Sequence, residues 1–255
     1  MDEAYVKDYF SKPGTVSLWW EPEQGDKSHI FEREINVLRD MLDGEDAYLA
    51  LDVACGKGRI SRTLNQIGID TISLDISQEM LDIGQKRGNI VRSQIGDGEK
   101  LPFNDNAFDV VICMDSLVHF PNPRRAINEA YRVLKKDGVY VCSTSNPYDL
   151  GFLPRAIAKG IRSIFGNNEK NKGEGIFRYI SSAQMKNALT ENGFNIEKDK
   201  KVGVLAPIEV RGANNTDFYI FPASFSRGLQ GLDRILEKIP LIRNLSIISI
   251  YKSRK

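Results

Sequence analysis

Apolar and polar residues follow two different periods along the chain from residue 48 onward. Short apolar runs bounded by turn residues are typical of buried strands, and apolar residues three and four positions apart are typical of helices. Such runs predict strands at Tyr48–Val53, Asp70–Asp75, Ile90–Ile95, Phe108–Met114 and Val139–Ser143. Helical periodicity between them predicts helices at Gly58–Ile67, from the N-cap Ser77 to Lys86, and at Pro123–Leu134.

This alternation of strand and helix indicates the fold class. Consecutive parallel strands need right-handed crossover helices, which then cover both faces of the sheet. We therefore predict an α/β fold with a doubly wound, mostly parallel sheet. A turn at Lys136-Asp137-Gly138 is expected to lead into the fifth strand.

The C-terminal part of the chain continues the same pattern. Ser181 is expected to cap a helix through Glu191, which Gly193 ends. Phe194–Val202 and Ile247–Tyr251 are predicted strands, the second followed by a basic tail.

Two further segments look added to this core, residues 148–176 and 203–245. The first contains a predicted amphipathic, basic helix at Phe152–Phe165, and the second a helix at roughly Ala223–Lys238. Phe152–Phe165 suits the wall of a substrate pocket or a peripheral contact with a membrane surface. Packing on the protein's own core fits the same pattern.

Composition limits the class of protein. The 255 residues are 41% hydrophobic and 27% charged, with a formal net charge of +1, so nothing favours nucleic acid as a partner. Cys55, Cys113 and Cys142 fall in predicted strands or at strand ends, which fits a reducing compartment better than a disulfide framework. The first residues lack the pattern of a signal peptide, and the apolar runs are too short to span a bilayer. These features favour a soluble, cytoplasmic protein.

The first candidate site is the turn after the first strand, where residues 51–59 read LDVACGKGR. Open α/β sheets bind ligands at this position, and Gly56 and Gly58 allow close approach of a ligand to the backbone. A tight turn with no ligand fits the same glycines. The second candidate is Asp75, at the end of the second strand, whose carboxylate suits the two hydroxyls of a ribose. Helix capping is its alternative role, although Ser77 already supplies a cap.

The charge of Asp52 separates two cofactor hypotheses. A carboxylate beside the loop would repel the pyrophosphate of a nicotinamide dinucleotide and attract the cationic end of S-adenosylmethionine. The glycine fingerprint G-x-G-x-x-G is also incomplete, because Ser61 stands where its third glycine belongs.

Two further segments lie where strands end. Asp97, in the turn GDGEKLPF, suits the exocyclic amine of an adenine, although an ordinary polar turn fits it as well. After the fourth strand, polar residues and His119 follow a buried run at the carboxyl edge of the sheet.

Taken in order, five segments closely resemble class I S-adenosylmethionine-dependent methyltransferases: LDVACGKGR, SLDIS, GDGEKLPF, FDVVICMDSLVHFPNP and RVLKKDGVYVCST. They are most similar to the small-molecule type that includes ubiquinone- and menaquinone-biosynthesis methyltransferases. The resemblance covers about a hundred residues. It implies a seven-stranded sheet whose last strand runs antiparallel, and S-adenosylmethionine as cofactor.

The resemblance also implies roles for single residues. The turn from Asp52 to Gly58 would hold the methionine portion, Asp75 the ribose, and Met114 would pack near the sulfonium. The implied cofactor-binding residues are Trp20, Asp52, Ala54, Cys55, Gly56, Gly58, Asp75, Ile76, Met80, Asp97, Gly98 and Met114. Ala54 departs from the family pattern D-x-G-x-G-x-G, and its methyl group is tolerable if its φ is negative. Lys57 is expected to point to solvent.

The resemblance implies a division of the chain as well. Residues 1–45 would form an N-terminal helical lid, in which Trp20 and its aromatic neighbours exclude water and face the sulfonium. Anchoring of the N-terminal helix to the core suits the same aromatic residues. Residues 46–147 would form the cofactor-binding core of a single methyltransferase domain, with the acceptor site shaped by 148–176 and 203–245.

His119 and Asp115 are the candidate catalytic residues. A neutral imidazole near the transferred methyl group can take a proton from the nucleophile, and Asp115 can orient the substrate. Structural roles in the loop fit both residues too. The sequence thus predicts direct methyl transfer to a small or lipid-like acceptor. A nicotinamide-dependent oxidoreductase and a non-catalytic cofactor-binding protein are the alternatives, and no metal-ligand spacing is present.

Overall fold

A seven-stranded sheet with the order β3-β2-β1-β4-β5-β9-β6 forms the centre of the computed structural model. The structure describes residues 3–12, 30–146, 148–149, 180–205, 209–211, 217–219 and 228–255. The strands of the sheet are β1 (Leu49–Val53), β2 (Asp70–Asp75), β3 (Arg92–Ile95), β4 (Phe108–Cys113), β5 (Leu134–Ser145), β6 (Asn195–Val202) and β9 (Ile248–Arg254). Neighbours pair in parallel except at β9, which is antiparallel to both β5 and β6. This confirms the predicted fold class.

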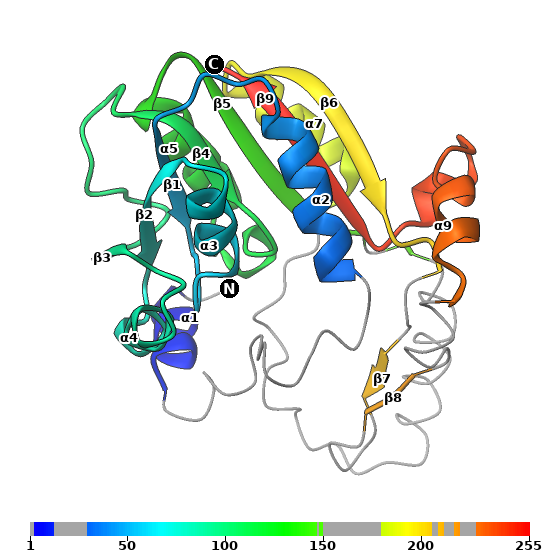
Figure 1. Ribbon diagram of the computed structural model, residues 1–255, viewed down its shortest axis with the longest axis horizontal. Coiled ribbons are helices and arrows are strands. Elements are labelled where there is room, and N and C mark those ends of the chain that lie inside the picture. The colour runs from blue at the N-terminus through cyan, green and yellow to red at the C-terminus, as the bar shows by residue number, and fades with distance from the viewer. Residues whose placement is uncertain are drawn as a thin grey trace.

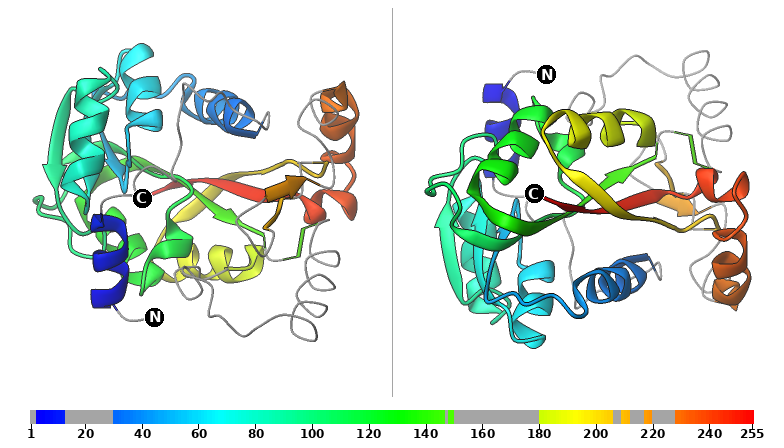
Figure 2. Two further views of the ribbon diagram at one scale, coloured as in Figure 1. Left: turned by 90° about the horizontal axis from the view of Figure 1, so that it is seen from below. Right: turned by 90° about the horizontal axis from the view of Figure 1, so that it is seen from above.

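Helices cover both faces of the sheet. On one face lie α2 and α3, and on the other lie α5 and α7 (Figures 1 and 2). The helices packed on the sheet are α2 (Ile30–Leu42), α3 (Arg59–Gln66), α4 (Gln78–Lys86), α5 (Pro123–Val133) and α7 (Ser182–Glu191). The remaining elements are α1 (Glu3–Ser11), η3 (Leu117–His119), α9 (Gln230–Leu236), η4 (Ile242–Leu245) and a separate pair of strands, β7 (Glu209–Arg211) and β8 (Asp217–Tyr219).

Alternate residues of the central strands enter two separate apolar cores. Leu51 of β1 and Val111 of β4 belong to the core under α5 and α7. Ala50 and Val110 belong to the core under α2 and α3. Because helices cover both faces of the sheet, odd and even positions of these strands are both apolar, as is typical of parallel sheets. The same alternation places Asp52 on the face of Ala50, beneath α3.

Local capping chemistry explains where several helices begin. The Ser77 hydroxyl accepts a hydrogen bond from the Met80 backbone amide, and Pro123 occupies the first turn of α5. Ser181 forms a capping box with Gln184 at the start of α7. These contacts satisfy amide groups that have no partner inside the helix, which confirms the predicted helix starts.

Three predicted boundaries were wrong. The turn at Lys136-Asp137-Gly138 is absorbed into the longer β5 as a register shift, with Asp137 at a φ of +61°. The third strand begins at Arg92, two residues later than predicted. Ile90 is instead buried beside Gly58 and Gly84, and Val91 is exposed. The basic tail is part of β9: Lys252 and Arg254 continue its pairing with β5 and β6, and Lys252 is buried.

The predicted division of the chain stays a prediction. α2, which belongs to the predicted lid segment 1–45, packs on one face of the sheet as part of an apolar core, whereas α1 contributes to neither core. Trp20, Phe152–Phe165 and most of the segment 148–176 lie outside the described residues. No helix in the described ranges is long and apolar enough to cross a bilayer.

Candidate functional site

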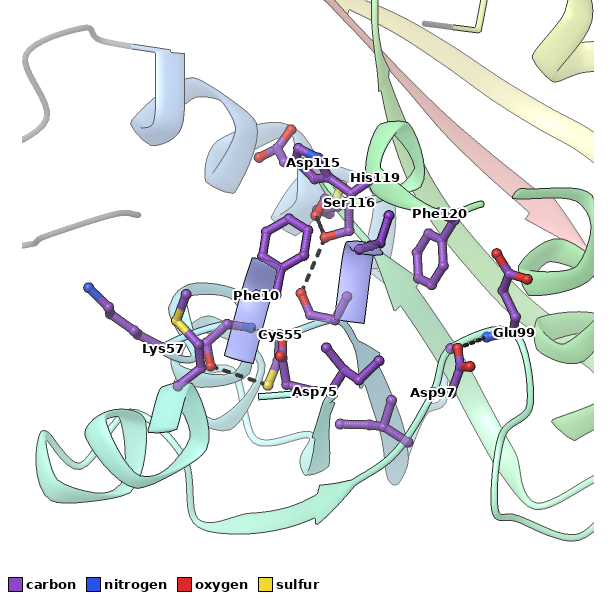
Figure 3. Close-up of a pocket in the computed structure, with 18 of the residues that line it drawn as sticks. Phe10, Cys55, Lys57, Asp75, Asp97, Glu99, Asp115, Ser116, His119 and Phe120 are labelled. Carbon is purple, nitrogen blue, oxygen red and sulfur yellow. Dashed lines mark hydrogen bonds between the residues drawn. The ribbon is translucent and has the colours of Figure 1, made fainter. Parts of the chain in front are cut away.

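A cavity of about 270 Å³ lies at the carboxyl edge of the sheet. It is walled by α1, α2, the loop after β1, the ends of β2 and β4, and the turn after β3. Figure 3 shows Cys55 and Lys57 of the loop at one end and Asp97 with Glu99 at the other. The predicted site residues that line it are Ala54, Cys55, Gly56, Asp75, Ile76, Met80, Asp97, Gly98, Met114, Asp115 and His119. Predictions drawn from distant parts of the chain therefore meet in one cavity.

Asp75 is held at the cavity wall by the backbone. Its Oδ2 accepts a hydrogen bond from the Gly56 amide at 2.8 Å, and its Oδ1 accepts one from the Ser77 amide at 2.9 Å. Burial raises the pKa of Asp75, and these backbone bonds oppose the rise. Each carboxylate oxygen has two lone pairs, so both oxygens keep the capacity to accept a hydroxyl.

Gly56 leaves room for a ligand beside the loop. Its φ is +54°, and a Cβ built on it would meet no atom within 4 Å. A side chain there would be strained and would project into open space. Gly58 has a different role: its φ is +82° and a Cβ would approach Ile90 to 2.5 Å. Gly58 is not in the cavity lining, and its small size serves the packing of α3 on the loop before β3.

Asp52 lies beneath the loop. It is 1% exposed, is not among the lining residues, and accepts a hydrogen bond from the Ser61 hydroxyl at 2.6 Å. Burial raises the pKa of Asp52 to about 7, against the lowering effect of the Ser61 bonds. The expected contact between Asp52 and a cationic ligand stays a prediction, with Ser61 as its partner in this structure.

Two expectations about the loop were wrong. Ala54 has a φ of +55°, so its methyl group stands in the left-handed region that favours glycine and the condition for easy tolerance is not met. Lys57 is 3% exposed and lines the cavity instead of pointing to solvent.

The turn after β3 closes the opposite end of the cavity. Asp97 Oδ1 accepts a hydrogen bond from the Glu99 amide at 2.9 Å, which fixes the turn. A Cβ on Gly98 would approach the Phe120 ring to 2.7 Å and Val53 to 2.9 Å. The glycine therefore allows the turn to lie close against the end of β1, with an aromatic ring beside it.

An ionic cluster that the sequence analysis missed joins α2, α3 and the end of β4. Arg59 donates through Nη1 to Glu34 Oε2 at 3.1 Å and through Nη2 to Asp115 Oδ2 at 2.5 Å. Arg59 and Asp115 line the cavity, whereas Glu34 is fully buried beside them. One signal was present in the sequence: Glu34 interrupts the apolar stripe of Ile30, Leu38 and Met41 on α2. Burial raises the pKa of Glu34 well above its usual range, and the nearby Asp115 charge adds to the rise.

His119 ends the short helix η3 and lines the cavity. Its ring and the ring of Phe10 from α1 lie edge to face, with centroids 5.2 Å apart. Val6 of α1 also contributes to the lining, so α1 covers part of the cavity next to the imidazole.

The residues that line the cavity suit an adenosine that carries a charged substituent. Asp75 offers a carboxylate to vicinal hydroxyls, Gly56 offers an open backbone cradle, and Ile76, Met80 and Phe120 offer apolar surface for a base. Within the described ranges, no group of three or more His, Cys, Asp or Glu side chains is arranged to hold a metal ion. The cavity suits binding and orientation of an organic cofactor.

Comparisons with known proteins agree with this chemistry. A family model described as "Methyltransferase domain" matches residues 51–142. The chain is 31% identical over 205 residues to an uncharacterized protein of Methanocaldococcus jannaschii, covering 75% of this chain and 76% of that one. It is 32% identical over 169 residues to Demethylmenaquinone methyltransferase of Lactobacillus johnsonii, covering 57% of this chain and 67% of that one.

The fold is similar to a solved structure as well. The crystal structure of magnesium protoporphyrin IX methyltransferase from Synechocystis with bound SAH superposes with a TM-score of 0.65. The superposition covers 100% of both chains at 17% sequence identity, and it shows that the two proteins share a fold.

Proposed function

The chain belongs to the S-adenosylmethionine-dependent methyltransferases, and we propose that it methylates a small or lipid-like molecule by direct transfer. Family membership excludes the nicotinamide-dependent alternative. The observation that carries the assignment to this cavity is Asp75, whose carboxylate is fixed by two backbone amides at the wall and keeps lone pairs for a ribose.

The lining supports a place for each part of the cofactor. In this proposal, Asp75 accepts hydrogen bonds from the ribose hydroxyls, Ile76 and Met80 pack on the adenine, and Asp97 with Gly98 contacts its edge. Ala54, Cys55 and Gly56 present backbone to the methionine portion, and Met114 packs near the sulfur. All of these residues line the cavity.

When bound, S-adenosylmethionine supplies a methyl group made electrophilic by the adjacent sulfonium. The work of this chain's residues is then mainly binding and orientation, which reduce the entropy cost of bringing two reactants together. Phe10 and Val6 of α1 line the cavity, and their apolar side chains would keep water from the bound cofactor. For an oxygen or nitrogen nucleophile, His119 takes the proton that the nucleophile loses. No covalent intermediate with the protein is required.

The character of the acceptor is inferred from the cavity and from one relative. Apolar side chains from α1 and α2, among them Phe10 and Phe31, form part of the wall. The name of the relative Demethylmenaquinone methyltransferase supports an acceptor of small-molecule kind. All three cysteines are free thiols, which supports our proposal that the protein works in the cytoplasm.

A labelling experiment tests the acceptor class. The protein is incubated with methyl-tritiated S-adenosylmethionine and a cell extract, and the products are partitioned between organic solvent and water. We expect protein-dependent label in a small molecule of the organic phase. Label in macromolecules would overturn the small-molecule proposal. Binding of the cofactor without transfer to any fraction would favour the non-catalytic alternative.

A further inference from the structure

The cavity wall contains an ion pair whose two members both face the ligand space. Arg59 and Asp115 line the cavity and are joined at 2.5 Å, with their side chains 12% and 29% exposed. The amino-acid end of S-adenosylmethionine carries an ammonium and a carboxylate on one carbon atom. Adjacent charges of opposite sign on the wall match adjacent charges of opposite sign on the ligand.

Arg59 has donors to spare for a carboxylate. A guanidinium has five N–H donors in a planar fork, which binds carboxylates in a bidentate manner. Its two bonds to Glu34 and Asp115 engage one donor on each terminal nitrogen. The centroid of the Phe31 ring lies 4.6 Å from the guanidinium carbon, and Phe31 lines the cavity too. The group is therefore fixed by contacts from two sides.

Asp115 is fixed in a strained conformation at the end of β4. Its φ is +56°, its amide donates to Ser143 Oγ at 2.7 Å, and its Oδ1 accepts a hydrogen bond from that hydroxyl at 3.1 Å. Non-glycine residues in this region of backbone space cluster at functional sites, where the surrounding structure holds them. The bond from the Ser143 hydroxyl holds the Asp115 carboxylate at the cavity wall.

Glu34 holds Arg59 from the protein side. Its Oε2 accepts the bond from Arg59, and its Oε1 is buried with no hydrogen-bond partner in the described part of the chain. Glu34 does not line the cavity, so it acts on the ligand only through its neighbours Arg59 and Asp115.

We propose that Arg59 binds the carboxylate and Asp115 the ammonium of the amino-acid end of S-adenosylmethionine, with Glu34 as the residue that positions Arg59. This inference rests on the proposed function and deepens it. Asp52, which is paired with Ser61 beneath the loop, then has no direct charge contact with the ligand. Arg59 is preferred to the lining residue Lys57 because its fork matches a carboxylate.

Calorimetry with two ligands tests the proposal. S-adenosylhomocysteine has the amino-acid end, whereas methylthioadenosine keeps the adenosine and the sulfur but ends in a methyl group. Arg59→Met is expected to weaken S-adenosylhomocysteine binding tenfold or more, because charge-assisted hydrogen bonds are lost. Its affinity for methylthioadenosine should stay within about twofold of wild type. Asp115→Asn, which keeps the shape and removes the charge, should show the same selectivity.

Matched variants separate binding from folding. Arg62→Met removes an exposed cation from the same helix and should leave both affinities unchanged. Glu34→Leu should lose affinity for S-adenosylhomocysteine selectively, and Glu34→Gln, which still accepts from Arg59, should restore most of it. If Arg59→Met does not fold, Arg59→Lys tests the same point, with a smaller selective loss expected from a cation that lacks the fork.

Three results would overturn the proposal: equal loss of both ligands in Arg59→Met, no loss of either, or a selective loss in Lys57→Met instead. Equal losses in Glu34→Leu and Glu34→Gln would remove the positioning role of Glu34. A wild-type protein that binds neither ligand would instead contradict the proposed function itself.

Discussion

Ala54 carries a methyl group where the backbone favours glycine. At its φ of +55°, the Cβ costs about 1–2 kcal/mol. Glycine relieves this strain and adds some entropy to the unfolded chain, so Ala54→Gly should raise the free energy of unfolding by about 0.5–1 kcal/mol. We expect the melting temperature of the ligand-free protein to rise by about 1–4 °C.

The control for this variant is Ala130→Gly. Ala130 lies in α5 and is buried at ordinary helical geometry. There the same substitution should lower the stability by about 0.5–1 kcal/mol. Opposite signs for the two variants are the expected outcome, and a fall at both positions would show that residue 54 is unstrained in solution.

Asp52 should make stability depend on pH. Because burial raises its folded pKa to about 7, the folded protein binds an extra proton between roughly pH 4 and pH 7. Stability from this group therefore falls as pH rises through that window and is constant above it. Asp52→Asn removes the titration while keeping an acceptor for Ser61. Urea unfolding gives the difference in the free energy of unfolding between the variant and the wild type. This difference should favour the variant more at pH 8 than at pH 5, by up to about 3 kcal/mol.

An equal change at both pH values would mean that Asp52 does not titrate in this window. Its carboxylate would then be charged in the folded protein even at pH 5.

The variant His119→Ala distinguishes proton transfer to His119 from catalysis by orientation alone. If His119 accepts the proton of the nucleophile, His119→Ala should lower turnover by roughly 10²–10⁴-fold and leave the affinity for S-adenosylhomocysteine nearly intact. Single-turnover kinetics and calorimetry measure the two quantities. A lower melting temperature and weaker binding, with turnover per folded molecule unchanged, would assign the residue to the support of η3. Full activity would leave orientation as the mechanism.

At the scale of elements, β9 holds the far side of the sheet together. It pairs with both β5 and β6, and its buried Lys252 forms ion pairs with Glu45 and Glu197. Although partial burial opposes it, bonds from Arg254 and Lys252 hold the pKa of Glu45 below its usual range. Lys252→Ala leaves these carboxylates without their buried partner, and should cost about 2–4 kcal/mol in urea unfolding.

Lys200→Ala is the matched control, since Lys200 lies on the neighbouring strand β6 and is exposed. That change should stay within about 0.5 kcal/mol. Equal small effects of the two variants would mean that residues 252–255 behave as a solvated tail.

At the scale of the whole molecule, the cavity joins segments that the chain keeps far apart. Phe10 of α1, Phe31 of α2 and the ends of β2 and β4 all contribute to one wall. A ligand that binds only this folded arrangement stabilises it, by about 2.7 kcal/mol at a concentration of 100 Kd. S-adenosylhomocysteine should therefore raise the melting temperature.

Phe10→Ala should reduce that rise. The variant removes apolar surface from the ligand side of the cavity, and we expect about three- to tenfold weaker binding. The ligand-free melting temperature should change little, because α1 lies outside the two cores. An unchanged ligand-induced shift would show that α1 does not cover the bound cofactor.

The features that the sequence alone determined are those that depend on neighbours along the chain. Hydrophobic period, the caps at Ser77 and Ser181, and the glycines of the loop after β1 act within a few residues. They were sufficient for the class of fold, the order of motifs and the family. Asp75 and Asp97 were found because the ends of parallel strands meet at one edge of the sheet.

Only the tertiary structure decided which charges meet. Arg59 is separated by 25 residues from Glu34 and by 56 from Asp115, and no local period links them. Asp52 faces α3 because alternate residues of β1 point to opposite faces of the sheet. The φ of Ala54 depends on the conformation of the loop after β1. Lys252 is buried because β9 lies between two strands and near Glu45 from the other end of the chain. Burial and pairing of charges are properties of the packed fold, since desolvation and Coulomb energy depend on distance in space and not on distance in sequence.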